Sequence, residues 1–196
     1  MLIAALAGIG AGAAHALAGP DHVLSLAPLA VGRRDAWRVG LRWGLGHGAG
    51  TLCWAVALLA SISATRLQGM DRWAEAAAGL ALVAMGIVGL RRRRAHEPGP
   101  APRGIFVVGL VHGASGGSAL LLLLPAVVAG SGIHTANYLA GFVAGSTVAM
   151  TALTASLARL SMAGGRSARV MARAGRMASL ASLALGAFWI GRGVVG

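Results

Sequence analysis

The chain has 196 residues, of which 57% are hydrophobic and 11% charged, and its formal net charge is +12 at pH 7. In soluble domains about a quarter of the residues are charged, so this composition excludes an ordinary soluble domain and indicates closely packed membrane helices. The positive charge does not indicate nucleic-acid binding, because the arginines lie between apolar runs and leave no soluble basic domain.

Six apolar stretches are long enough to cross a hydrocarbon core, which takes roughly 20 helical residues. In chain order we expect transmembrane helices at about 2–31, 39–62, 73–90, 105–130, 135–158 and 176–194. The first is predicted to break at Gly19-Pro20, because proline removes a backbone hydrogen bond and clashes with the preceding turn. The N-terminal run lacks a charged start and is too long for a signal peptide, so we expect it to be mature structure.

The two halves of the chain align on one another. Setting His15 on His112 also places Gly19 on Gly116, Asp21 on Ser118 and Pro28 on Pro125. Weaker matches relate the second helix to the fifth and the third to the sixth. Because each half has three spans, such a repeat is inverted in topology.

The predicted fold class is therefore all-α, a polytopic membrane protein of six transmembrane helices in a 3+3 inverted repeat. Its first and fourth helices are expected to be broken. The predicted divisions are a first three-helix repeat at 1–90, a basic, proline-rich cytoplasmic linker at 91–104 and a second three-helix repeat at 105–196.

The arginines predict the orientation in the membrane. Thirteen lie in the loops after the first, third and fifth helices, and three lie on the opposite side. By the positive-inside rule, both termini should lie on the non-cytoplasmic side of a cytoplasmic (inner) membrane. The run Arg91–Arg94 is interpreted as a topology anchor.

Five side chains inside the predicted spans have the chemistry to bind a metal ion, namely His15, Asp21, His22, His47 and His112. Ionisable groups inside a membrane are costly and mark a functional site by default. Imidazole with carboxylate suits borderline divalent ions such as nickel, cobalt or zinc. A purely structural role, as buried hydrogen-bonding residues, stays open for His47 and His112. The single cysteine, Cys53, excludes an intrachain disulfide and a cysteine-pair redox relay.

The sequence from His15 to His22, His-Ala-Leu-Ala-Gly-Pro-Asp-His, resembles the first-helix signature of the nickel/cobalt transporter superfamily, especially its short, urease-accessory-like members. Residues 43–50 and 111–118 look like two further motifs of that family. The resemblance implies that His15, Asp21 and His22 are metal ligands, with His47 and His112 completing or gating the site. Here five residues, instead of four, separate the first histidine from the Asp-His pair, which leaves the metal and the direction of transport open.

The predicted function is a membrane permease for divalent transition-metal ions, nickel or cobalt first, with zinc, manganese and iron as alternatives. The metal is then a substrate, and no resident cofactor and no enzymatic activity are expected. The expected partners are the metal ion and the lipid bilayer, with no nucleic acid, and homo-oligomerisation is left open. If the repeats are inverted, their broken helices meet near mid-membrane and His112 approaches Asp21 and His22.

Two alternatives remain at this stage, a metal exporter in place of an importer and an intramembrane serine protease of the rhomboid kind. Gly113-Ala-Ser115-Gly116 resembles the rhomboid nucleophile motif. Such an enzyme needs a histidine base within hydrogen-bond reach of the serine. Rhomboids place that base on the sixth helix, and this chain has no histidine after His134.

Overall fold

The computed structural model describes residues 1–60, 76, 79–80, 82–91, 102–114, 132–163 and 168–195. Every regular element within these ranges is a helix, which confirms the predicted all-α class. The helices are α1 (Leu2–Ala18), α2 (Pro20–Ala30), α3 (Ala36–Ala60), α5 (Pro102–Ala114), α7 (Gly132–Met162) and α8 (Ala168–Val195), together with a short helix at Leu82–Arg91.

The predicted break in the first apolar stretch lies between α1 and α2, which meet at a bend of 70°. Gly19 is extended, with φ −80° and ψ 109°, and its N–H donates to the carbonyl oxygen of His15 at 3.3 Å. Pro20 then begins α2, in the first turn of the helix, where a missing N–H breaks no hydrogen bond. The corresponding break predicted for the fourth stretch falls at 115–131, outside the described residues.

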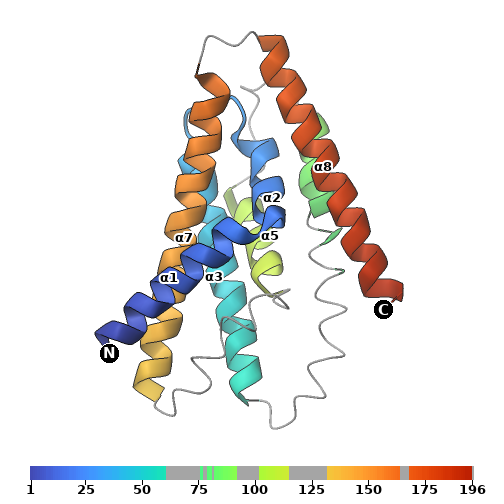
Figure 1. The fold of residues 1–196 in the computed structure, drawn as a ribbon. Coiled ribbons are helices and arrows are strands. Elements are labelled where there is room, and N and C mark those ends of the chain that lie inside the picture. Colours follow the sequence, from blue (N-terminus) through green and yellow to red (C-terminus); the bar gives the residue numbers. More distant parts are fainter. Residues whose placement is uncertain are drawn as a thin grey trace.

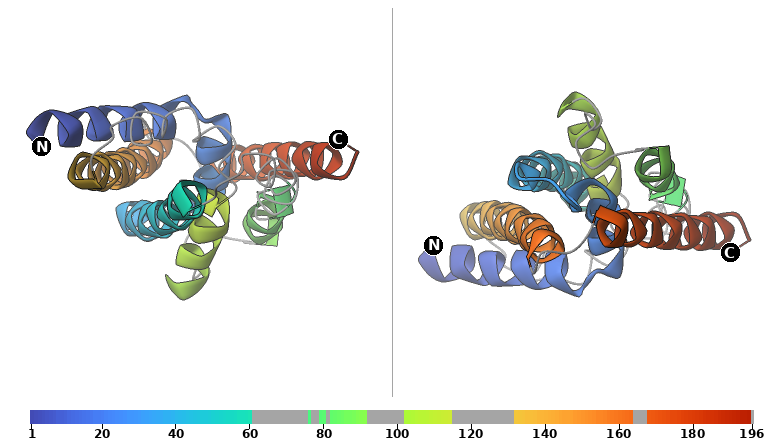
Figure 2. Two further views of the ribbon diagram at one scale, coloured as in Figure 1. Left: turned by 90° about the horizontal axis from the view of Figure 1, so that it is seen from below. Right: turned by 90° about the horizontal axis from the view of Figure 1, so that it is seen from above.

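Helices α3, α7 and α8 run lengthwise through the molecule, and α1 runs obliquely across α7 and α3 (Figure 1). Helix α2 ends near the end of the molecule where α7 stops and α8 starts, and α3 begins there too. Seen along this axis, α1 lies beside α7, while α8 and Leu82–Arg91 lie together on the other side (Figure 2). The centre is filled by large apolar side chains with no exposed surface, among them Trp43, Phe142, Leu26 and Met150.

Helices α1 and α7 touch through glycines spaced four residues apart. A Cβ atom at Gly8 would fall on the carbonyl oxygen of Tyr138, and Gly12 meets the α7 backbone one turn further on. Gly141 and Gly145 of α7 in turn face backbone atoms of α1. Reciprocal small residues at this spacing allow two helix backbones to approach closely, as in the GxxxG motif of membrane helices.

Helices α3 and α5 repeat this arrangement. Gly46 and Gly50 of α3 face the backbone of α5, and Gly109 of α5 faces the carbonyl oxygen of Trp43. Thr51 Oγ1 adds a hydrogen bond to the carbonyl oxygen of Gly113 at 3.3 Å. These contacts fix α5 against the middle of α3.

By length and composition, α7 is apolar enough to cross a membrane, and the bent pair α1–α2 adds a second such segment if it is counted as one span. Helices α3 and α8 have 25 and 28 residues and are long enough, but neither contains an 18-residue stretch that is apolar enough to cross a membrane. The described ranges thus show one or two apolar spans, and six spans are not shown. Helix α8 also starts earlier than predicted, at Ala168, because the arginine-containing stretch before 176 is helical.

Candidate metal centre

Four helices bring the five predicted site residues to one buried place. His15 lies in the last turn of α1, and Asp21 and His22 lie in the first turn of α2, on either side of the Gly19 break. His47 comes from the middle of α3 and His112 from the last turn of α5. Each of the five is at most 8% exposed. Sequence positions 91 residues apart are therefore neighbours in the folded chain.

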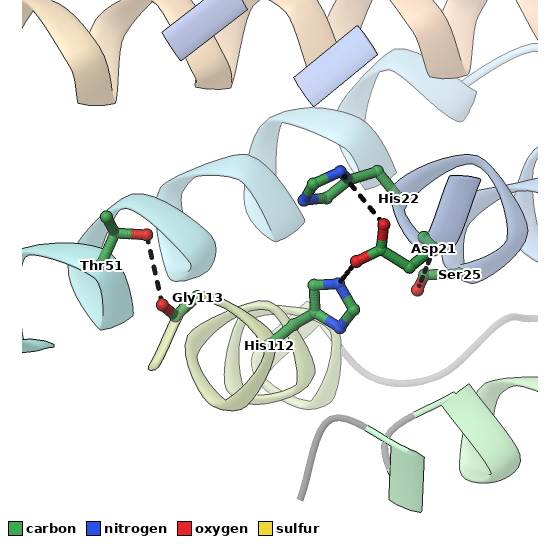
Figure 3. A network of polar contacts seen from close by, with 6 residues as sticks. All are labelled: Asp21, His22, Ser25, Thr51, His112 and Gly113. Carbon is green, nitrogen blue, oxygen red and sulfur yellow. Dashed lines mark hydrogen bonds and ion pairs between the residues drawn. The ribbon is translucent and has the colours of Figure 1, made fainter. Parts of the chain in front are cut away.

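Asp21 makes the closest polar contacts of the centre (Figure 3). Its Oδ2 atom lies 2.7 Å from Nε2 of His112, and its Oδ1 atom lies 3.7 Å from Nδ1 of His22. The Ser25 hydroxyl donates to the backbone carbonyl of Asp21 at 2.7 Å, which fixes the first turn of α2. A buried carboxylate is tolerated only where hydrogen bonds or opposite charges replace water, and His112 supplies the first of these.

His22 lies in the middle of the cluster and is 1% exposed. Its ring centroid is 4.8 Å from that of His15, 5.1 Å from that of His47 and 5.3 Å from that of His112. The rings of His15 and His47 are stacked at 5.4 Å. The other three imidazoles thus cluster around His22, next to the Asp21 carboxylate.

Several ring nitrogens of this cluster have no hydrogen-bond partner in the part of the chain that the structure describes. They are Nε2 of His15 and both nitrogens of His22 and of His47. Leaving a buried polar group unsatisfied costs about 1–3 kcal/mol, so folded proteins seldom gather such groups without a ligand. The unpartnered nitrogens are the feature of this site that most needs an explanation.

The donor atoms form two groups of three whose members lie within 4.8 Å of one another, His15–His22–His47 and Asp21–His22–His112. Bonds of about 2.0–2.1 Å place any two ligand atoms of one ion at most about 4.2 Å apart. Three ligand atoms around one ion lie only about 3.3–3.6 Å apart, so each group would have to contract by up to about 1.5 Å to enclose an ion. Imidazole nitrogen with carboxylate oxygen is the donor set of borderline divalent metals, so the residues present fit such an ion.

Glycine at position 19 leaves room for the central ring. A Cβ atom there would fall on Nδ1 of His22 and would lie 2.7 Å from Oδ1 of Asp21. The helix break therefore does more than turn the chain, because it also clears the space into which the Asp21-His22 pair folds.

Two tryptophans that the sequence reasoning missed cover the cluster. The Trp43 ring stacks on His47 with centroids 5.2 Å apart and planes 9° from parallel, and Trp189 stacks on His112 at 6.3 Å. Trp43 precedes His47 by one helical turn, so helical periodicity alone would have placed both on one face. Trp189 comes from α8, and no signal in the sequence relates it to His112.

Asp35, at the opposite extreme, is an exposed acidic residue between α2 and α3. Arg33 binds it through two hydrogen bonds, Nε to Oδ1 at 2.9 Å and Nη2 to Oδ2 at 2.7 Å. These hydrogen bonds hold the pKa of the Asp35 carboxyl below its ordinary value. The pair is a surface feature and provides a comparison for the buried Asp21.

Fold and site together define an all-helical protein with a buried histidine–aspartate centre. The chain is 31% identical over 175 residues to the chloroplast protein FOR GROWTH AND FERTILITY 2 of Arabidopsis thaliana, covering 79% of this chain and 46% of that protein. It is 30% identical over 188 residues to FOR GROWTH AND FERTILITY 1 of the same plant, covering 83% and 51%. The chain thus spans about half the length of these curated relatives. No protein family and no solved structure match it significantly.

These relatives correct the identification made from the first-helix signature. They are named as chloroplast growth and fertility proteins, so the assignment to the nickel/cobalt transporter superfamily is wrong. The predicted nickel or cobalt permease, importer or exporter, is contradicted with it. Three short motifs in a chain rich in Ala, Gly and Leu carry less information than similarity over about four-fifths of its length.

Three further predictions concern the rhomboid alternative, the location of the protein and the roles of the site residues. Nothing in these comparisons favours the rhomboid alternative, and Ser115 lies outside the described residues. The predicted cytoplasmic (inner) membrane is not supported either, because the names of the relatives place them in chloroplasts. The roles of the five site residues as ligands stay a prediction.

Proposed function

We propose that the protein is a membrane-embedded helical protein that holds divalent transition metal at its buried centre of His15, Asp21, His22, His47 and His112. The observation that carries the proposal is the convergence of unpartnered buried nitrogens on a buried carboxylate. The proposal concerns binding alone, with the metal as a resident part of the protein. Histidine would supply neutral donors, and Asp21 would offset part of the charge of the cation.

The distribution of polar and apolar side chains supports the membrane setting. Large apolar side chains are exposed along several helices, among them Leu2, Ile3, Leu6, Val56, Val107, Val148, Leu160, Met177, Leu180 and Phe188. Polar side chains are buried, including Ser146, Thr154, Ser179 and Ser182. Extensive exposed apolar surface marks contact with lipid or protein, and buried hydroxyls with glycine contacts are typical of helix packing in bilayers.

Contacts between the third helices of the two halves support the finer proposal of an inverted repeat. A Cβ atom at Gly79 would lie 2.6 Å from the carbonyl oxygen of Gly186, and one at Gly86 would lie 2.8 Å from that of Ser179. Aligning Leu80 with Leu180 relates the two helices by 100 positions, and this offset converts the first contact into the second, with Gly79 replaced by Ser179 and Gly186 by Gly86. A two-fold relation between antiparallel halves predicts this reciprocity.

The printed names of the relatives bear on the setting of the protein rather than on its chemistry. They place those proteins in chloroplasts and relate them to growth and fertility. A metal-holding membrane protein is compatible with both statements. The proposal therefore depends on the geometry of the centre and is tested there.

The test compares two acidic residues in the whole protein purified in detergent. After removal of bound metal, we expect zinc or manganese to bind at one ion per chain or more. Asp21→Asn should weaken the binding of at least one ion by about 10- to 100-fold, because it removes the charge that offsets the cation. Asp35→Asn changes an exposed carboxylate in the same way and should leave the affinity unchanged. A parent protein that binds neither ion, or an Asp21→Asn variant that binds like the parent, would overturn the proposal.

A further inference from the structure

We infer that the centre holds two metal ions, bridged by the imidazole ring of His22. One ion would be bound by His15, His22 and His47, and the other by Asp21, His22 and His112. This inference rests on the proposed metal-binding function and adds the number of ions and the role of the shared ligand.

The grouping of the donor atoms is the first observation. The ligand atoms of the five residues fall into two groups of three, each with its atoms within 4.8 Å of one another, and the groups have only His22 in common. Three protein ligands around one ion, with the next position left to water, is a common arrangement in proteins that use zinc. Each group is therefore a complete set of protein ligands by itself.

The orientation of His22 is the second observation. Its Nδ1 atom lies on the side of Asp21, 3.7 Å from Oδ1. In Figure 3 the other ring nitrogen lies on the side of the ring away from Asp21. Both nitrogens are buried and lack hydrogen-bond partners among the residues that the structure describes. One ion can satisfy only one nitrogen of a ring, whereas an ion on each side satisfies both.

Bridging requires a balance of protons and charge. A neutral His22 ring carries one proton, which leaves to solvent when the second ion binds, and no electrons are transferred. The ring is then an anion that bridges the two ions. Together with Asp21 it provides two negative charges, which offset only part of the charge of two divalent cations. Because positive charge remains in a buried place, the second ion binds more weakly than the first. Its affinity rises with pH, since binding releases a proton.

Counting ions in single variants tests the assignment of ligands. We expect two zinc ions per chain in the parent at saturation, and one in each of His47→Ala and His112→Ala. His134→Ala removes an exposed histidine outside the centre and should retain two. Two ions in His47→Ala, or loss of both ions from each single variant, would overturn the inference. Circular dichroism and size-exclusion chromatography show whether each variant is folded.

A measurement on the unsubstituted protein keeps the inference testable if the variants misfold. Copper(II) is added in steps, and its electron paramagnetic resonance signal is recorded. An imidazolate bridge couples the two unpaired spins, so the signal should grow with the first ion and fall as the second binds. Two ions without spin coupling, or saturation at one ion, would overturn the bridge and leave the proposed metal binding intact. Absence of any bound ion would overturn both.

Discussion

Asp21 and His22 are neighbours in sequence and share His112 as a neighbour, but their other partners differ. Asp21 contacts His112 of the other half of the chain, whereas His22 lies among His15, His47 and His112. A helical turn that begins at Pro20 directs both side chains inward, and Gly19 keeps that space clear. The local backbone thus determines which groups can reach one another.

Gly19→Ala tests this dependence. The added Cβ would fall on the His22 ring and would have to displace it. Mutations that disturb the orientation of metal ligands typically weaken metal binding by about 10- to 100-fold, so we expect the affinity to fall by at least about tenfold. Gly10→Ala, in α1, adds the same methyl group where no atom lies within 4 Å. That control should bind metal like the parent and, by helix propensity, gain up to about 1 kcal/mol of stability. Equal affinities in the two variants would contradict the role given to Gly19.

The five residues of the centre could be selected from the sequence, because His and Asp residues inside predicted membrane spans are rare and costly. The alignment of His15 with His112 also gave the expectation that the two halves meet near Asp21, and the structure places His112 there. The stacking of Trp189 on His112 was not predictable, since it depends on how α8 packs. Sequence spacing relates residues of one helix but not residues of helices that are distant in the chain.

At the scale of helices, glycine contacts determine which pairs associate. Helix α1 packs on α7 and α5 packs on α3, so the first helix of each half lies against the second helix of the other half. The helices themselves could be predicted from apolar runs and the Gly-Pro break. Their pairing could not, because many glycines occur at four-residue spacing in this chain and only tertiary packing selects among them.

Gly141→Ala should separate α1 from α7. Its Cβ would fall on the carbonyl oxygen of Ala5, and backbone atoms cannot give way as a flexible side chain can. Overpacking of this kind costs about 1–3 kcal/mol, so we expect a lower midpoint of thermal unfolding in detergent. Gly132→Ala in the same helix meets nothing within 4 Å and is the matched control. The packing would be refuted if Gly141→Ala unfolded at the same temperature as Gly132→Ala.

At the scale of the whole molecule, arginines gather at one end of the part of the chain that the structure describes. The link between α2 and α3 contains Arg33 and Arg34, and the residues that start α8 contain Arg169 and Arg173, all at the same end in Figure 1. Helix α7 begins at the opposite end, at Gly132. The proposed membrane setting and the positive-inside rule together place the arginine-rich end in the cytoplasm of an expressing bacterium.

Cysteine labelling in intact cells tests this orientation. In a Cys53→Ser background, Gly132→Cys should react with a membrane-impermeant thiol reagent, while Arg34→Cys should react only after the membrane is opened. Residue 34 is exposed in the folded chain, so its protection would come from the bilayer. Labelling of both positions from the same side would contradict the proposed span, and the reverse pattern would contradict the orientation.

The two glycine-packed helix pairs differ in register, although the proposed repeat relates them. Gly12 and Gly109 each precede their histidine by three residues, yet Gly12 meets the carbonyl of Phe142 and Gly109 that of Trp43. When Ala49-Gly50-Thr51 of α3 is aligned with Ala144-Gly145-Ser146 of α7, Phe142 corresponds to His47, which is one turn, about 5.4 Å, beyond Trp43. The symmetry is therefore broken at the centre, and the two proposed ligand triads are chemically unlike. One offers three nitrogens and the other two nitrogens with a carboxylate oxygen, so the softer ion of a mixed pair should select the first and the harder ion the second.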